Sequence, residues 1–477
     1  MRPGFDLDGK RVLVVGLART GVAAALFCAG YGAIVAATDI KPEDELREVA
    51  AKLRAARIDL ALGPNAAVDL SGLDLIVVSP GVPSKIALLE TARSQGIPVW
   101  SEIELAWRFL RGKLIAITGS NGKTTTTSLV GHILKTANIP TLVGGNIGTP
   151  LLARVESSMD STVTVAEVSS FQLETIEAFR PEIGVLLNLT PDHLDRHESF
   201  EQYAAAKMRM FENQLERDFA ILNADDPEVT RRMPSRPHIY WFSRKKRVAQ
   251  GSFVMDGQIV FRIEGSENPL LRVEDIRLKG EHNVENVLAA CTAASLAGAD
   301  AASIANGVKT FQGVEHRLEF VAEVNGVAFY NDSKATNVDA TVKAIESFPG
   351  SLIVILGGKD KGTGYAELRE PLRQRARLVL LIGAAAEKIA PQLEGAVPME
   401  HAGTIGRAVE LAAERAKPGD VVLLAPACAS FDQFENYEHR GRVFKELVAQ
   451  IKRESGGGTA QMAAAEIPLE KGANDAS

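Results

Sequence analysis

The sequence has little cysteine, few aromatic side chains and no long run of apolar or basic residues. Its three cysteines, Cys28, Cys291 and Cys428, are too far apart for the spacing of a metal site. Each has small or apolar neighbours, which predicts buried free thiols and fits a reducing cytoplasm. No segment approaches the ~20 apolar residues of a membrane span, and the polar first ten residues do not resemble a secretory signal. We therefore expect a cytoplasmic protein without a membrane span.

The charge is mixed throughout the chain. Lys and Arg number 53 and Asp and Glu number 60, for a formal net charge of −7. Without a basic run, nucleic acid is not an expected partner. The length of 477 residues predicts about three domains. We place them at 1–112, 113–312 and 313–453, followed by a Gly-, Ala- and Ser-rich tail, 454–477, that we expect to be disordered.

The stretch from Leu114 to Thr127 joins an apolar strand to a helix through a Gly-rich turn. Gly119 and Gly122 allow a tight turn whose backbone N–H groups can face an anion. Lys123 adds a positive charge, and Thr124 adds a hydroxyl that can bind Mg²⁺. This order matches a P-loop, although its glycines lie closer together than in the common form. We interpret it as a site for ATP or GTP; the alternative is a Gly-rich turn without a ligand.

The chain opens with a βαβ pattern. A strand at 11–15 is followed by the loop 16–21, an apolar helix to about Gly30 and a strand at 33–38. Asp39 then lies where the acid of a dinucleotide-binding fold meets a ribose hydroxyl. The alternative is a turn whose glycines serve packing alone.

Strands and helices alternate through the rest of the chain, which predicts the α/β class. We expect a Rossmann-like first domain, a P-loop ATPase-like middle domain and a Rossmann-like last domain with a parallel sheet covered on both faces. In the middle domain we expect strands at 162–166, 182–187 and 219–222, helices at 200–213 and 283–296, and a small antiparallel insert at 253–276. In the last domain we expect strands at 327–330, 352–356, 378–382 and 421–424.

Polar side chains follow the strands beside the P-loop strand. Glu167 comes directly after an apolar strand, where an α/β fold places a Mg²⁺ ligand. After the next strand, Asp192, His193, Asp195 and His197 share one loop, and a His there can coordinate a metal or position a phosphate. The alternatives are a helix N-cap for Glu167 and a solvated turn for the loop.

The last domain has three polar loops after strands, at 331–337, 357–362 and 426–434. The carboxyl ends of parallel strands form the ligand-binding edge of open α/β sheets. Lys334, Lys361 and Ser430 could therefore hold an anionic substrate such as an amino-acid carboxylate.

Seven motifs occur together and in one order along nearly the whole chain except the tail. They are Thr118–Thr125, Gly144–Gly148, Glu167–Ser170, Asn188–His193, His282–Asn286, Glu315–Glu319 and Asn331–Asn337. With these motifs the chain resembles the Mur ligase family of bacterial peptidoglycan synthesis. The first-domain loop and the last-domain loops are similar to those of the branch that adds D-glutamate.

The resemblance implies a reaction. ATP would phosphorylate the carboxylate of UDP-N-acetylmuramoyl-L-alanine, and the amine of D-glutamate would attack the acyl phosphate to give an amide and phosphate. ATP is needed because a carboxylate is a poor electrophile and phosphate is a good leaving group. Catalysis would then consist of positioning and charge neutralisation. The partners would be these small molecules alone, and we expect a monomer.

The resemblance also implies roles for individual residues. For catalysis these are Lys123, Glu167, His193 and Lys207, with Lys207 carbamylated by CO₂. Two Mg²⁺ ions would be bound by Thr124, Glu167, His193 and the Lys207 carbamate. ATP would contact Gly119, Ser120, Asn121, Gly122, Lys123, Thr124, Thr125, Asn283, Arg317 and Asp332. The UDP substrate would contact Arg19, Thr20, Asp39 and Asn146, and D-glutamate would contact Lys334, Thr336, Lys361, Ser430 and Tyr437. Without the resemblance, Lys207 looks like a helical surface lysine.

Four other functions compete with this interpretation. A sibling ligase would add L-alanine, a diamino acid or a dipeptide, but the last-domain loops favour D-glutamate. A folylpolyglutamate synthetase-like ligase would lack the residues before the P-loop. A P-loop protein that only regulates a partner would not need the catalytic set. An NAD-dependent dehydrogenase, suggested by the first βαβ pattern, would leave the P-loop unexplained.

Overall fold

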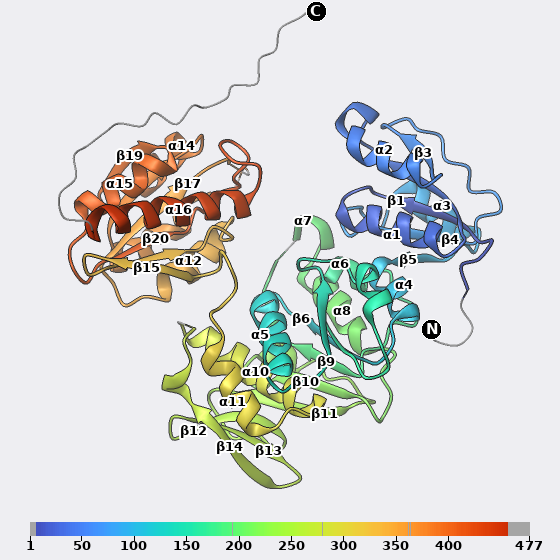
Figure 1. Cartoon of the computed structure of the whole chain (residues 1–477), viewed down its shortest axis with the longest axis horizontal. Coiled ribbons are helices and arrows are strands. Elements are labelled where there is room, and N and C mark those ends of the chain that lie inside the picture. The colour runs from blue at the N-terminus through green and yellow to red at the C-terminus, as the bar shows by residue number, and fades with distance from the viewer. Residues whose placement is uncertain (1–5, 193, 279, 361, 363, 457–477) are drawn as a thin grey trace, which may run out of the picture. The chain divides into compact units, whose positions relative to one another are not determined.

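The computed structural model describes residues 6–456 except 193, 279, 361 and 363 (Figure 1). The chain forms two compact units that divide between Val314 and Glu315. The first unit contains a five-stranded and a nine-stranded sheet, and the second contains a six-stranded sheet. Helices connect the strands of each sheet, which confirms the predicted α/β class (Figure 1).

The first sheet has the order β3-β2-β1-β4-β5, and all its pairs are parallel. Its strands are β1 (Arg11–Val15), β2 (Ile34–Asp39), β3 (Asp59–Leu62), β4 (Leu75–Val78) and β5 (Val99–Ser101). Its helices are α1 (Arg19–Gly30), η1 (Glu43–Glu45), α2 (Arg47–Ala55), α3 (Ala87–Ser94) and α4 (Glu102–Phe109). Helix α1 begins two residues before Gly21, so Arg19 and Thr20 lie in its first turn rather than in a loop.

The nine-stranded sheet has the order β14-β13-β12-β11-β10-β9-β6-β8-β7. Its strands are β6 (Lys113–Thr118), β7 (Thr141–Gly145), β8 (Val163–Glu167), β9 (Ile183–Leu186), β10 (Phe219–Asn223), β11 (His238–Ser243), β12 (Gly251–Met255), β13 (Gln258–Ile263) and β14 (Ser266–Arg272). The predicted antiparallel insert is confirmed as β12, β13 and β14. It is not a separate sheet, because β12 pairs in parallel with β11 and so extends the main sheet.

The helices of this domain run between its strands. They are α5 (Lys123–Thr136), η2 (Leu152–Ser157), α6 (Ser170–Leu173), α7 (Leu194–His197), α8 (Phe200–Met208), η3 (Arg209–Phe211), α9 (Pro227–Thr230), η4 (Val273–Asp275), α10 (Glu281–Ala297) and α11 (Ala301–Thr310). Strand β6 lies between β9 and β8 and is buried from its second residue onward. The P-loop therefore starts from the end of a buried inner strand that is paired on both sides.

The six-stranded sheet has the order β15-β16-β20-β17-β18-β19. Its strands are β15 (Glu319–Val324), β16 (Val327–Asn331), β17 (Leu352–Gly357), β18 (Ala376–Ile382), β19 (Met399–Gly403) and β20 (Val421–Leu424). Its helices are α12 (Val338–Glu346), η5 (Ala366–Leu368), α13 (Arg369–Arg375), α14 (Ala386–Leu393), α15 (Ile405–Arg415) and α16 (Tyr437–Gly456). The four predicted strands, β16, β20, β17 and β18, pair in parallel as expected. The sequence did not predict β15, which pairs antiparallel with β16 at one edge.

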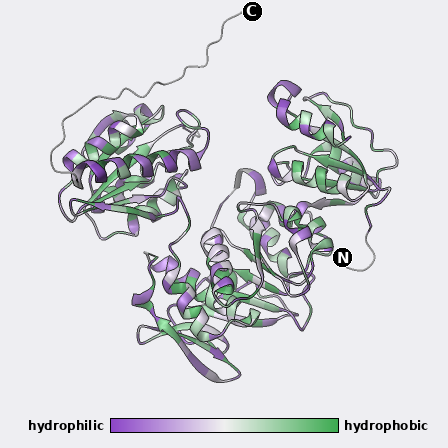
Figure 2. Cartoon of the chain, viewed as in Figure 1, coloured by the Kyte–Doolittle hydropathy of each residue, from purple (hydrophilic) through white to green (hydrophobic). Residues whose placement is uncertain are grey.

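The strands consist mostly of hydrophobic residues, whereas the helices mix hydrophobic and hydrophilic ones (Figure 2). The prediction of buried free cysteines is confirmed for Cys28, Cys291 and Cys428. Helix α16 continues to Gly456, so the start of the expected disordered tail is helical, and the remainder lies outside the described residues. In the part of the chain that the structure describes, no helix is long and apolar enough to cross a membrane.

Candidate active site

The carboxyl ends of β9, β6 and β8 bring the predicted phosphate and Mg²⁺ residues together. These three strands are parallel neighbours, so the P-loop after β6 lies beside Glu167 at the end of β8. The Thr124 hydroxyl donates a hydrogen bond to Glu167 Oε2 at 2.7 Å, and both side chains are buried. The two residues that sequence reasoning placed near Mg²⁺ are thus in direct contact.

The P-loop takes its shape from two glycines with positive φ, Gly119 at +151° and Gly122 at +83°. A Cβ on Gly122 would also lie 2.1 Å from Asn286 Oδ1, so only glycine fits there. Lys123 Nζ donates to the carbonyl oxygens of Gly119 and Ser120, both at 2.8 Å. The lysine is therefore held against the same loop whose backbone can face a phosphate.

Lys207 is buried, with 1% of its surface exposed, so the interpretation of a surface lysine from its local sequence is wrong. Its Nζ donates to the Gly119 carbonyl at 2.9 Å and lies 4.6 Å from the centre of the Tyr203 ring. Burial, and then the neighbouring positive charge of Lys123, lower the Lys207 pKa well below its usual value. The neutral amine is therefore favoured far more than in an ordinary lysine.

Sequence reasoning missed two polar residues that contact the P-loop. The Tyr203 hydroxyl donates to Ser120 Oγ at 2.9 Å, and Thr126 Oγ1 donates to Asn286 Oδ1 at 3.3 Å. The spacing of each from a predicted site residue on the same helix could have indicated them. Tyr203 precedes Lys207 by four residues on α8, and Asn286 follows Asn283 by three on α10, so each pair shares a helix face.

Asn283 and Asn146 each lie beside a residue of this cluster. Asn283 is buried and accepts a hydrogen bond from Asn286 Nδ2 at 3.0 Å. Asn146 Nδ2 donates to Glu167 Oε1 at 2.9 Å, although the resemblance gave it to the UDP substrate. Both oxygens of Glu167 thus have partners, since Thr124 donates to the other.

The loop after β9 contributes less to the described site. His193 lies outside the described residues, so its predicted metal role stays a prediction. His197 is buried, with Nε2 at 3.0 Å from Ser170 Oγ and Nδ1 at 3.3 Å from Glu174 Oε1. Among residues 6–456 that the structure describes, no group of three His, Cys, Asp or Glu side chains could hold a metal ion.

The predicted UDP-site residues Arg19, Thr20 and Asp39 lie at the carboxyl edge of the first sheet. Asp39 accepts hydrogen bonds from the backbone N–H groups of Leu17 at 2.6 Å and Lys41 at 2.9 Å. A cavity of about 650 Å³ opens beside Leu17 and Arg19 and continues between α1 and η2. Its volume lies within the range of small-molecule sites.

In the second unit the three predicted loops follow neighbouring strands, β16, β20 and β17. The buried Arg440 connects two of the loops by donating to the Ser333 carbonyl at 2.8 Å and the Cys428 carbonyl at 3.2 Å. Lys334 Nζ donates to the Tyr437 hydroxyl at 3.0 Å. The structure therefore brings these two predicted amino-acid residues together.

The other predicted residues of this unit lie on the same loops. Thr336 donates its backbone N–H to the Lys334 carbonyl at 2.7 Å, Ser430 is buried, and Lys361 lies outside the described residues. Burial raises the Asp332 pKa to about 6, even though the nearby Arg317 charge lowers it. Asp332 is thus a buried carboxyl that interacts electrostatically with the half-buried Arg317.

Family models match most of the chain. The Mur ligase MurD-like N-terminal domain matches residues 10–101, the Mur ligase middle domain matches 117–294, and the Mur ligase glutamate ligase domain matches 316–428. The chain belongs to the Mur ligase family, which confirms the resemblance found in its motifs.

Relatives cover almost the full chain. The UDP-N-acetylmuramoylalanine–D-glutamate ligase of Acidobacterium capsulatum is 56% identical over 449 residues, covering 93% of this chain and 97% of the relative. The ligase of the same name from Koribacter versatilis is 54% identical over 450 residues, covering 94% and 99%.

Solved structures share the fold at lower identity. A pseudomurein peptide ligase type C from Methanothermus fervidus has a TM-score of 0.57 at 20% identity and covers 93% of this chain and 100% of its own. UDP-N-acetylmuramate-alanine ligase from Thermotoga maritima has a TM-score of 0.58 at 19% identity, covering 92% and 99%. At these identities the likeness concerns the fold alone.

Proposed function

We propose that the chain joins D-glutamate to UDP-N-acetylmuramoyl-L-alanine, with ATP as the energy source, in peptidoglycan precursor synthesis. One observation carries the proposal. The half-buried Lys123 and the buried Thr124, Glu167 and Lys207 meet on the P-loop of a chain that is 56% identical to a ligase of that name. The cluster supplies cationic and oxygen-bearing groups for ATP phosphates, and an ATP phosphate can activate a carboxylate.

The reaction has two steps. A carboxylate oxygen of the UDP substrate attacks the γ-phosphorus of ATP, and the bond from that phosphorus to ADP breaks. The D-glutamate amine then attacks the acyl carbon, loses a proton, and the carbon–oxygen bond to phosphate breaks. Lys123 and the P-loop N–H groups stabilise the phosphate charge, while Lys123 exchanges its carbonyl partners for phosphate oxygens.

The donor set suits Mg²⁺, which prefers oxygen ligands. Thr124 Oγ1 and Glu167 Oε2 lie 2.7 Å apart, and we assign both to one ion. Bound Mg²⁺ would neutralise part of the phosphate charge. The second ion, with His193 and a Lys207 carbamate as ligands, stays part of the proposal.

The surroundings of Lys207 suit carbamylation. Its neutral amine can attack CO₂, forming an N–C bond and releasing one N–H proton. The resulting anion would lie near the positive charge of Lys123, the same charge that disfavours the protonated amine. Burial keeps water away from the amine, with 1% of the residue exposed. A cation unsuited to metal binding would thereby become an anionic oxygen ligand.

The remaining roles follow the family resemblance. We assign Arg19, Thr20, Asp39 and Asn146 to the UDP substrate, and the P-loop from Gly119 to Thr125, with Asn283, Arg317 and Asp332, to ATP. We assign Lys334, Thr336, Lys361, Ser430 and Tyr437 to D-glutamate. The ammonium of Lys334 suits a substrate carboxylate. Because ATP and the nucleotide-linked precursor are cytoplasmic metabolites, we also place the protein in the cytoplasm. We propose that it acts as a monomer.

The test is phosphate release from ATP with UDP-N-acetylmuramoyl-L-alanine and a panel of amines. The panel contains D-glutamate, L-glutamate, L-alanine, L-lysine and meso-diaminopimelate. We expect release that depends on D-glutamate and a product whose mass includes one glutamate residue. Release with another amine would replace the D-glutamate assignment with that of a sibling ligase. Absence of release with every amine would reject the proposed reaction.

A further inference from the structure

The backbone around Arg317 is held in an unusual conformation. Its neighbours, His316 and Leu318, have φ values of +62° and +41°, in the left-handed region that non-glycine residues seldom adopt. Such a conformation persists only where the surroundings impose it, and it is often found at functional sites.

The His316 ring is the centre of the surrounding contacts. The ring is buried, with 3% of His316 exposed, and its Nδ1 lies 2.9 Å from Asn331 Nδ2. The His316 backbone N–H donates to Glu319 Oε2 at 2.9 Å, and its carbonyl accepts from the Lys334 N–H at 3.1 Å. These bonds fix both the backbone and the side chain of His316.

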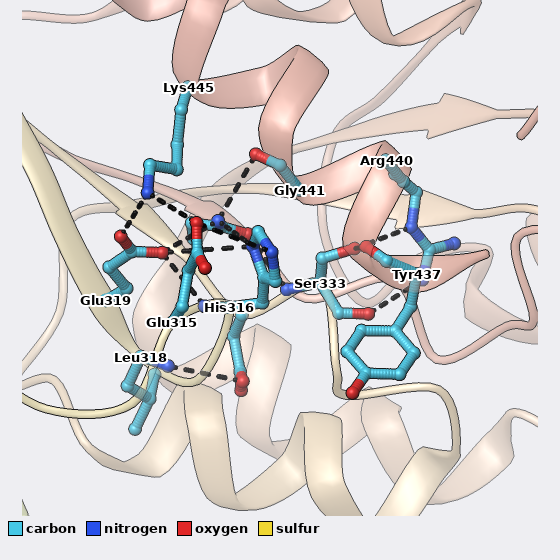
Figure 3. Close-up of polar contacts among 11 residues, drawn as sticks. Glu315, His316, Leu318, Glu319, Ser333, Tyr437, Arg440, Gly441 and Lys445 are labelled. Atoms are coloured by element: carbon cyan, nitrogen blue, oxygen red, sulfur yellow. Dashed lines mark hydrogen bonds and ion pairs between the residues drawn. The ribbon is translucent and has the colours of Figure 1, made fainter. Parts of the chain in front are cut away.

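One face of α16 closes over this loop. Tyr437, Gly441 and Lys445 are spaced four residues apart, so they lie on one side of the helix. The Tyr437 ring packs edge-on against His316 at 6.3 Å, and Lys445 Nζ lies 2.6 Å from Glu319 Oε1 (Figure 3). A Cβ on Gly441 would lie 2.2 Å from His316 Nδ1. Glycine is therefore what allows the helix to approach the ring.

We infer that His316, packed against Gly441, is a positioning residue that holds Arg317 and Asp332 in place for the ATP-driven step. The Leu318 N–H, which follows Arg317 in the chain, donates to Asp332 Oδ1 at 3.2 Å, so the loop and Asp332 are connected directly. The inference rests on the proposed function, in which Arg317 and Asp332 bind the nucleotide. His316 would act through Arg317 and touch no substrate.

The first test compares Gly441→Ala with Gly406→Ala. Both glycines are helical and lie in the second unit, but a Cβ on Gly406 meets nothing within 4 Å. We expect Gly441→Ala to raise the KM for ATP at least about tenfold and to lower kcat, since small displacements of positioning groups have large effects. The KM for the UDP substrate should stay within about twofold of the parent value, and Gly406→Ala should match the parent in all constants.

The KM pattern distinguishes positioning from loss of folded protein. Partial unfolding lowers kcat through a smaller active fraction and leaves every KM unchanged. That pattern, or parent-like constants in Gly441→Ala, would overturn the inference. If Gly441→Ala does not fold, the variants His316→Ala and His316→Asn test the positioning role instead. Asn tolerates positive φ and keeps a polar group for Asn331, so it should retain several-fold more kcat/KM for ATP than Ala.

If His316→Ala and His316→Asn lose the same share of kcat, and the KM for ATP is unchanged in both, the positioning role is rejected. A failure to obtain either variant in folded form would show that His316 serves stability first, and this too would reject it. The parent protein is assayed with D-glutamate in the same series. If the parent shows no D-glutamate-dependent turnover, the proposed function fails. If the parent turns over D-glutamate and the variants have the same kinetic constants as the parent, the inference alone fails.

Discussion

At the scale of single residues, burial gives Lys207 a chemistry that its sequence neighbours do not suggest. The local sequence predicts a surface lysine, but the folded chain places its amine against the Gly119 carbonyl and near Lys123. Burying an amine in this way destabilises the protein, because the protonated form loses its hydration. In the proposed function, the same burial would make the amine a nucleophile for CO₂ by favouring its neutral form. Stability and activity should therefore respond in opposite directions when Lys207 is replaced.

We expect Lys207→Met to lose at least about 99% of activity and to gain on the order of 1 kcal/mol or more in free energy of unfolding at pH 7. The folded pKa of Lys207 lies below its unfolded value, so the folded state is penalised wherever the unfolded chain binds the extra proton. The gain should thus shrink as the pH rises towards the unfolded value of 10.5. Urea unfolding in CO₂-free buffer at several pH values measures it.

Lys135→Met is the matched control for this experiment, since Lys135 is exposed on α5. It should change neither activity nor the pH dependence of unfolding. A Lys207→Met variant that keeps full activity, or whose stability gain grows with pH, would contradict the account of Lys207.

At the scale of elements, the sequence identified most strands that pair on both sides. The apolar runs of β6, β9, β10, β17 and β20 were predicted to within two residues, because buried parallel strands are almost continuously apolar. The P-loop and the order of polar loops were predicted for the same reason, since each follows such a strand.

Edge strands were harder to predict. β15 and β19 have many exposed or half-buried residues, and β7 is half-buried over its first three, so each lacks the continuous apolar run of a central strand. Site contacts that depend on tertiary structure were also missed. Tyr203 and Asn286 reach the P-loop from α8 and α10, and neither helix is adjacent to the loop in sequence.

Helix α4 carries a buried carboxylate that should make stability depend on pH. Glu102 is about 1% exposed, and its Oε1 accepts a hydrogen bond from the Leu152 N–H at 2.7 Å. Within the described part of the chain, its Oε2 has no hydrogen-bond partner. Burial raises the Glu102 pKa to about 7. The unfolded chain loses this proton near 4.5, so stability from Glu102 is present below that pH and is lost as the pH rises through 7.

Glu102→Gln keeps an oxygen for the Leu152 N–H without a charge to bury. We expect it to be more stable than the parent by up to about 3 kcal/mol at pH 8, with the difference nearly absent at pH 4.5. Urea unfolding midpoints at both pH values measure this. Glu156→Gln, at an exposed position in η2, should leave the pH dependence unchanged. A constant difference at both pH values would show that Glu102 does not titrate in this range.

At the scale of the whole molecule, candidate residues occupy the carboxyl edge of each of the three sheets. Asp39 follows β2 in the first sheet, the P-loop follows β6 in the second, and Asp332 follows β16 in the third. This is the ligand-binding edge of α/β sheets. The three family models match one region of each sheet-bearing part of the chain. In the proposed function, each sheet edge would bind one of the three substrates.

The most direct test of the account follows one oxygen atom. UDP-N-acetylmuramoyl-L-alanine labelled with oxygen-18 in its carboxylate is converted with ATP and D-glutamate, and the released phosphate is analysed by mass spectrometry. We expect one labelled oxygen in each phosphate, because the carboxylate oxygen that bonds to phosphorus leaves with it. Amide formation with unlabelled phosphate would contradict the claim that the chain activates the carboxylate by phosphorylation.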